Sequence, residues 1–145
     1  MIFMDKTCAI VIPARIGSKR LPNKLLIEIA GKPLISWVIE AALKVDFKAE
    51  VIVATDDNRI KEVSEDLGIK SFLTSKDIKN GTERILEILD HIDSEFIINL
   101  QGDEPLVNPI DLSDLYKAIK SNNVDIASIC HEVDSLEAED PSNVK

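Results

Sequence analysis

A cluster of basic residues directly follows the first apolar run of the chain. The run at residues 8–12 breaks at Pro13 into a loop with four basic side chains, those of Arg15, Lys19, Arg20 and Lys24. No acidic residue occurs between positions 6 and 28, although the net charge of the whole chain is −9. A cationic loop directly after a buried strand is suited to binding a polyphosphate.

Neither of the two common glycine-rich phosphate motifs occurs in the chain. Phosphate binding would instead combine the backbone amides of residues 14–18 with the side chains of Arg15 and Lys24. The alternative is a solvated basic loop without a ligand. Pro13 and Pro22 favour the binding function, because they stiffen a loop that would otherwise lose more entropy on ordering.

A second polar cluster, Gln101-Gly-Asp-Glu-Pro105, follows the apolar run at residues 96–100. Mg²⁺ is commonly held through one or two carboxylates together with phosphate oxygens of the substrate, and Asp103 is placed for that role. The alternative is an ordinary surface turn. The position of this cluster at the end of a strand, opposite a basic loop, favours the metal site.

The third cluster, Asn80-Gly-Thr-Glu-Arg84, has the spacing of a capping box between Asn80 and Glu83. The free amides of the predicted helix start would let Gly81 and Thr82 contact a base or ribose. Arg84 opposes the helix dipole there, so we expect it to have an acidic or ligand partner. In the pair at positions 56 and 57, the second Asp is a candidate helix cap and Asp56 could face the ligand.

The elements that must position these residues alternate between short β-branched runs and amphipathic stretches, the pattern of an α/β fold with a mostly parallel sheet flanked by helices. We predict strands at 8–12, 51–54, 71–73, 96–100 and 125–130. Helices are predicted to begin near Pro33, after Asp57 with an end at Gly68, from Asn80 to about residue 92, and from Pro109 to about residue 122. Ligands of open parallel sheets lie beyond the carboxyl ends of the strands.

Length and charge limit the function classes. A chain of 145 residues with 45% hydrophobic residues can form one domain, here residues 1–145. The net charge of −9 argues against general binding of nucleic acid or anionic membranes. The N-terminal apolar run is too short to span a membrane. Cys8 and Cys130 lie in apolar segments and are expected to be reduced core thiols, which indicates a cytoplasmic protein.

The C-terminal residues look incomplete. An acidic stretch at 131–140 is followed by residues 141–145 without a helix, cap or turn. We therefore expect the chain to stop where the next strand of the sheet would begin.

Taken together, these clusters closely resemble the 3-deoxy-manno-octulosonate cytidylyltransferases, also called CMP-Kdo synthetases. The resemblance covers the chain from about residue 8 to its last residue. Its motifs, in the order of the family, are Ile12-Pro-Ala-Arg15 with Lys19-Arg-Leu-Pro-Asn-Lys24, Gly31-Lys-Pro-Leu-Ile35, Ala54-Thr-Asp-Asp57, Gly81-Thr-Glu-Arg84 and Gln101-Gly-Asp-Glu-Pro105.

The resemblance implies a fold of the nucleotide-diphospho-sugar transferase (Rossmann-like) type and the reaction CTP + Kdo → CMP-Kdo + diphosphate, assisted by Mg²⁺, in lipopolysaccharide synthesis. Arg15 and Lys24 match triphosphate ligands of the family, and Arg20 matches a basic residue near the reacting groups. Gln101 and Asp103 match residues at the sugar–phosphate junction, with Asp103 as metal ligand. The expected catalytic residues are therefore Arg20, Lys24 and Asp103, and the expected CTP contacts come from Pro13, Ala14, Arg15, Lys24, Gly81, Thr82, Gln101 and Gly102.

Family members extend well past residue 145 and are homodimers, and their C-terminal part supplies much of the sugar pocket, dimer contacts and a second metal-binding aspartate. We therefore expect this chain alone to bind CTP weakly and to turn over little or none. Within the enzyme class, the alternative is a CMP-sialic-acid-type or amino-Kdo cytidylyltransferase. From another class, the alternative is a non-catalytic CTP-binding half or remnant.

Overall fold

The apolar run after Thr7 forms the central strand of the computed structural model, which describes residues 7–18, 20–122, 124–130 and 132. Lys19, residue 131 and residues 133–145 lie outside the described residues. The predictions for Lys19 and for the stretches 131–140 and 141–145 therefore fall on residues that, apart from Glu132, are not described. This strand, β1 (Cys8–Ala14), is buried along its whole length. It pairs in parallel with β4 (Ala49–Thr55) on one side and with β6 (Phe96–Asn99) on the other.

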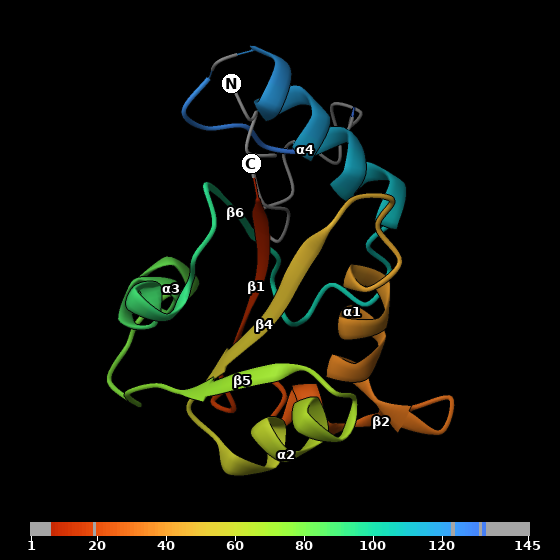
Figure 1. Cartoon of the computed structure of the whole chain (residues 1–145). Helices are drawn as coiled ribbons and strands as arrows, with labels where there is room; N and C mark the ends of the chain where they lie inside the picture. Colours follow the sequence, from red (N-terminus) through yellow and green to blue (C-terminus); the bar gives the residue numbers. More distant parts are fainter. Residues whose placement is uncertain (1–6, 19, 123, 131, 133–145) are drawn as a thin grey trace.

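The sheet has four parallel strands in the order β5-β4-β1-β6, with β5 (Lys70–Leu73) beside β4. A short antiparallel hairpin of β2 (Glu28–Ile29) and β3 (Lys32–Pro33) lies outside the sheet (Figure 1). Parallel strands need crossover connections, and helices supply them here. The predicted fold class, an α/β protein with a parallel sheet and flanking helices, is confirmed.

Alternate residues of β1 point to opposite layers of the molecule. Ile10 and Ile12 belong to the larger core, which also contains buried residues of α1 (Leu34–Ala42), α2 (Asn58–Asp66) and α4 (Pro109–Asn122). Ala9 and Val11 belong to a smaller core closed by α3 (Gly81–Glu87). In Figure 1, α3 and α1 accordingly lie on opposite sides of β1. Because β1 is enclosed on both faces, its sequence is continuously apolar rather than alternating.

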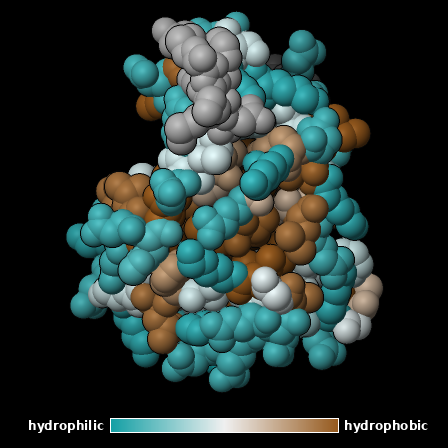
Figure 2. All heavy atoms as spheres, viewed as in Figure 1, coloured by the Kyte–Doolittle hydropathy of each residue, from teal (hydrophilic) through white to brown (hydrophobic). Residues whose placement is uncertain are grey.

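The helix starts lie at or next to the predicted capping residues. Pro33 directly precedes α1, and the side chain of Asp57 accepts a hydrogen bond from the backbone N–H of Arg59 at the start of α2. Helix α2 ends two residues before Gly68 and buries only Ile60 and Ser64. Its other side chains are exposed or partly exposed, and Figure 2 shows hydrophilic atoms along the lower end of the molecule, where α2 lies.

Two predicted elements differ from the structure: one predicted strand does not form, and one helix is shorter than predicted. Residues 125–130 form no strand, and within the described chain β6 pairs only with β1. Residues with high β-propensity form a stable strand only when they pair with a neighbouring strand and pack against an apolar surface. Ile126 is accordingly 87% exposed. The helix predicted to reach residue 92 ends at Glu87, where the Ile88 N–H donates to the Ile85 carbonyl and a 3₁₀ turn, η2 (Leu89–His91), follows.

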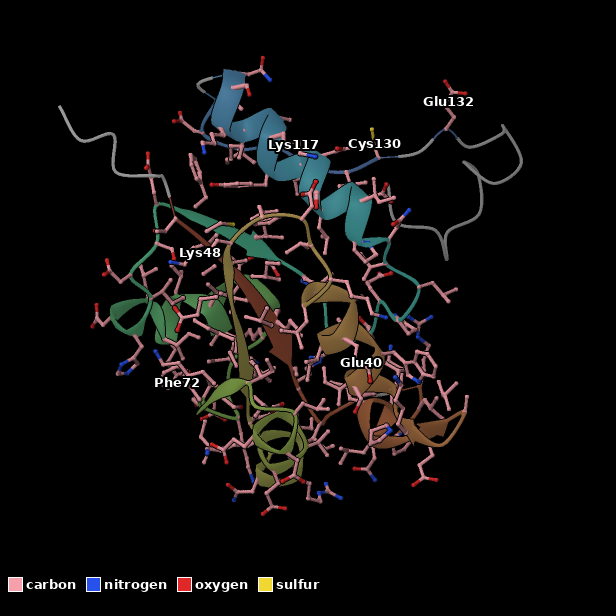
Figure 3. All side chains as sticks on the ribbon, turned by 45° about the vertical axis from the view of Figure 1, so that its right-hand side comes forward. Glu40, Lys48, Phe72, Lys117, Cys130 and Glu132 are labelled. Carbon is pink, nitrogen blue, oxygen red and sulfur yellow. The ribbon has the colours of Figure 1, made fainter. Side chains whose placement is uncertain are left out.

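The prediction of two core cysteines is half right. Cys8 is buried in β1, and burial raises the pKa of its thiol to about 11. Cys130 is exposed on the segment that leaves α4 (Figure 3), because the strand that would have buried it does not form. No helix in the described part of the chain is long and apolar enough to cross a lipid bilayer.

Candidate active site

The basic loop begins where β1 leaves the sheet at Ala14. The Ile16 N–H donates a hydrogen bond of 2.8 Å to Asp56 Oδ1, directly after β4, and this contact holds the start of the loop against the sheet. The loop returns through Asn23, which has a left-handed φ of 55°, into a 3₁₀ turn, η1 (Lys24–Leu26), whose Leu25 is buried. With both ends fixed, the loop presents Arg15 and Lys24 above the carboxyl end of β1.

The segment after β6 approaches the same end of β1. Gly102 N–H donates to the Pro13 carbonyl at 3.3 Å, and this close pairing would crowd any side chain at position 102. A Cβ there would lie 3.1 Å from the Pro13 carbonyl oxygen and 3.2 Å from Ile35 Cδ1. Glycine at this position therefore lets the chain turn close to β1 and directs Asp103 toward the basic loop.

Lys24 and Asp103 meet as an ion pair between Nζ and Oδ2, although they are far apart in sequence. Their side chains are 33% and 42% exposed, so both remain accessible. The parallel arrangement of β1 and β6 explains this contact, because it brings both carboxyl ends to the same edge of the sheet. The predicted proximity of the basic loop and Asp103 is thereby confirmed.

The third wall comes from the N-terminus of α3. Asn80 Oδ1 accepts from the Glu83 N–H at 2.9 Å, and Asn80 Nδ2 donates to Glu83 Oε1 at 2.9 Å, so the predicted interaction between these two residues forms. Gly81 follows and packs against β1: an added Cβ would lie 3.0 Å from Pro13 Cγ and 3.1 Å from Gln101 Nε2. The helix start therefore lies against both other segments.

These three segments enclose a cavity of about 330 Å³ beyond the carboxyl ends of β1 and β6. Of the predicted site residues, Ala14 is buried within β1, and Arg20 and Thr82 are exposed and do not line the cavity. The described residues that line it are Pro13, Arg15, Gly17, Ser18, Lys24, Leu25, Ile78, Lys79, Asn80, Gly81, Arg84, Gln101, Gly102 and Asp103.

The charge of the cavity is opposite to that of the chain. Among the described lining residues, Arg15, Lys24, Lys79 and Arg84 are basic and Asp103 is acidic. A concave surface with this excess of cations attracts an anion, even on a protein of net charge −9. Sequence reasoning did not identify Lys79 or Ile78, which belong to no phosphate-binding pattern and enter the cavity only because they precede α3.

Arg84 has the acidic partner that the helix dipole led us to expect. Its Nη2 donates to Asp56 Oδ2 at 3.3 Å, and the side chains of Arg84 and Asp56 are only 2% and 8% exposed. Asp56 was predicted as a possible ligand contact. In the structure it lies behind the cavity wall and contacts the loop and helix that line it.

The match to known proteins agrees with this site. A family model described as "Cytidylyltransferase" matches residues 9–145. The chain belongs to the cytidylyltransferase family. The 3-deoxy-manno-octulosonate cytidylyltransferase of Escherichia coli is 44% identical over 137 residues, which are 94% of this chain and 56% of the relative. That of Coxiella burnetii (strain RSA 493) is 47% identical over 134 residues, or 88% of this chain and 53% of the relative.

A solved structure described as CMP:2-keto-3-deoxy-manno-octonic acid synthetase complexed with CTP superposes on this chain with a TM-score of 0.77 and 44% identity. The match covers 81% of this chain and 48% of that one. The resemblance to CMP-Kdo synthetases and the nucleotidyltransferase fold are thereby confirmed. The chain spans about half the length of the curated relatives that it matches.

Proposed function

We propose that the cavity binds CTP and that this chain forms the nucleotide-binding part of an enzyme that transfers CMP to 3-deoxy-manno-octulosonate (Kdo). The observation that carries the proposal is the meeting of Lys24 and Asp103 at a cavity in which the other charged side chains of the described residues are basic. A triphosphate needs cations, and a metal-assisted transfer needs one accessible carboxylate. The names of the relatives supply the base and the sugar acid.

In this proposal, Arg15 and Lys24 bind the triphosphate. Both line the cavity from the loop after β1, and Lys24 is held at its rim by the ion pair with Asp103. When phosphate oxygens approach, Lys24 exchanges one anionic partner for another and keeps its charge compensated. The exposed Arg20 lies on the same loop, and its predicted role near the reacting groups stays a prediction, as do contacts from Ala14 and Thr82.

Asp103 is the residue that would hold a divalent cation. Among the described residues there is no group of three or more His, Cys, Asp or Glu side chains that could bind a metal without substrate. A single accessible carboxylate at an anion-binding cavity fits Mg²⁺, which is commonly shared between one or two carboxylates and substrate phosphates. When bound there, Mg²⁺ would neutralise charge on the triphosphate.

The cytidine end would lie toward α3 and Gln101. Gln101 Nε2 donates to Asn99 Oδ1 at 2.9 Å, which fixes the orientation of the amide beside the Gly81 backbone. The backbone N–H groups at a helix start have no intrahelical partner and can donate to a ligand. We infer that Gly81 and Gln101 contact the base or ribose, with Pro13 and Gly102 shaping the wall between them.

The reaction is an in-line substitution at the α-phosphorus. The Kdo hydroxyl oxygen forms the new P–O bond, the bond to the bridging α–β oxygen breaks, and diphosphate leaves with that electron pair while the hydroxyl proton passes to water. Phosphoryl-type transfer depends mainly on positioning and charge neutralisation, which are the contributions that Arg15, Lys24 and Asp103 would make.

The test of this proposal is calorimetric titration of the full chain with CTP in the presence of Mg²⁺. Asp103→Asn should weaken binding about tenfold, because the cation loses its carboxylate. Glu104→Gln is the matched control: it removes the adjacent carboxylate, which does not line the cavity, and should leave the affinity unchanged. Equal binding of UTP or ATP, or no effect of Asp103→Asn, would contradict the assignment.

A second candidate is a CTP-binding half without turnover, because Asp103 is the one acidic residue among the described residues that line the cavity. Release of diphosphate separates the two. The chain is mixed with CTP, Mg²⁺ and, in separate reactions, Kdo, amino-Kdo or a sialic acid. Release with one acceptor identifies a transferase and its sugar; CTP binding without release in any reaction identifies a nucleotide-binding half.

A further inference from the structure

Three segments that are distant in sequence meet at one buried carboxylate, that of Asp56. Its side chain is 8% exposed, and its two oxygens have different partners. Oδ1 accepts from the Ile16 N–H of the basic loop at 2.8 Å, and Oδ2 accepts from Arg84 Nη2 of α3 at 3.3 Å. A buried carboxylate needs partners, and Asp56 has one on each oxygen, so loss of either contact is expected to be costly.

The guanidinium of Arg84 extends this connection to a further segment. Nη1 donates to the Thr74 hydroxyl and, at 3.4 Å, to the Ser75 carbonyl, both beyond the end of β5. The Arg84 N–H also donates to the Asn80 carbonyl at 3.3 Å, so this side chain projects from the first turn of α3. Asp56 is therefore linked to the loop on one wall of the cavity and, through Arg84, to the helix start on another.

We propose that Asp56 is a positioning residue for the triphosphate: it fixes the loop that carries Arg15 relative to the N-terminus of α3 before CTP arrives. The inference rests on the proposed function. A loop that is ordered in advance loses less conformational freedom on binding, and this difference appears directly as affinity. Freezing the backbone of one residue costs enough to change a dissociation constant by about tenfold.

The chain offers a matched control in Ser113 of α4. Its buried hydroxyl also accepts a backbone N–H from a distant loop, that of Asp46 at 3.2 Å, and donates to the Pro109 carbonyl at 3.0 Å. Ser113 does not line the cavity. Ser113→Ala therefore removes a comparable loop contact, whereas only Asp56 is connected to the residues that would bind phosphate.

The experiment is calorimetric titration of the full chain with CTP and, separately, CMP, each with Mg²⁺, after circular dichroism has shown that each variant is folded. Asp56→Ala should weaken CTP binding about tenfold and CMP binding less than about threefold, because CMP lacks two of the three phosphates that the loop would bind. Asp56→Asn keeps an oxygen for the Ile16 N–H and should lose about threefold for CTP. Ser113→Ala should bind both nucleotides like the wild type.

A wild-type chain that gives no heat with CTP would overturn the proposed function, and the positioning role with it. A wild type that binds CTP while folded Asp56→Ala binds equally well would overturn the positioning role alone. Equal losses for CTP and CMP would also overturn it, since a general structural defect does not distinguish the phosphates. If Asp56→Ala fails to fold, Asp56→Asn decides by the same criteria.

Discussion

Gly102→Ala is expected to destabilise the fold and to displace Asp103. Position 102 is buried, and the added Cβ would lie 3.1 Å from the Pro13 carbonyl oxygen, 3.2 Å from Ile35 Cδ1 and 3.4 Å from Ala14 Cβ. The first of these neighbours is backbone of the central strand, which cannot move without disturbing both cores. The segment after β6 must therefore shift outward, which lengthens the 3.3 Å hydrogen bond from Gly102 to Pro13.

The size of the effect follows from this crowding. Overpacking of a buried position costs about 1–3 kcal/mol, and in a chain of this length each kcal/mol lowers the melting temperature by roughly 2–4 °C. We expect a fall of roughly 5 °C for Gly102→Ala, measured by circular dichroism. CTP affinity should fall as well, because Asp103 moves out of the cavity in which it would hold Mg²⁺.

Gly17→Ala is the matched control. Apart from the adjacent residues of the chain, a Cβ at position 17 would have no heavy atom within 4 Å, whereas a Cβ at position 102 would be crowded. Its melting temperature should stay near that of the wild type or rise slightly. If Gly102→Ala melts within about 1 °C of Gly17→Ala, the close approach to β1 does not constrain this position and the reasoning is refuted.

Three further outcomes can be measured. Asn80→Ala should lower the free energy of unfolding in urea by about 1 kcal/mol through loss of the α3 cap, and Asn80→Ser should restore most of it. The pKa of Asp57 is lowered, chiefly by its hydrogen bond with Arg59, so its contribution to stability is present above its unfolded pKa of about 3.9 and is lost as the pH falls through the folded value. The difference in stability between wild type and Asp57→Ala should therefore shrink on acidification from about pH 6 to about pH 2. With a thiol reagent at pH 8, one cysteine should react quickly, the exposed Cys130, and Cys8 should react only after unfolding; two fast thiols would contradict its burial and raised pKa.

Much of the site could be predicted because it depends on local patterns and on one property of parallel sheets. The apolar runs before Pro13 and Gln101 identified β1 and β6, and their parallel pairing brings Lys24 and Asp103 together. The spacing of Asn80 and Glu83 identified the start of α3 because capping requires only residues near in sequence.

The remainder depends on which strands are neighbours. Asp56 contacts Ile16 because β4 lies beside β1. A sequence pattern can predict both strands, but it does not indicate that they are neighbours in the sheet. The expectation that Arg84 has an acidic or ligand partner contained a usable signal, since Asp56 directly follows a predicted strand, although it was interpreted as a possible ligand contact. The strand predicted at 125–130 is wrong for the same reason: the composition of this segment suits a strand, but no described strand lies beside it.

The carboxyl end of β1 links the interior of the protein to its ligand. Pro13 is in contact distance of both Gly81 and Gly102, and Ile12, the preceding residue, is fully buried in the larger core. A substitution that shifts this strand slightly would carry two sides of the binding cavity along with it. Thermostability and nucleotide affinity should therefore vary together in libraries of core variants, and a screen for either property would also select on the other.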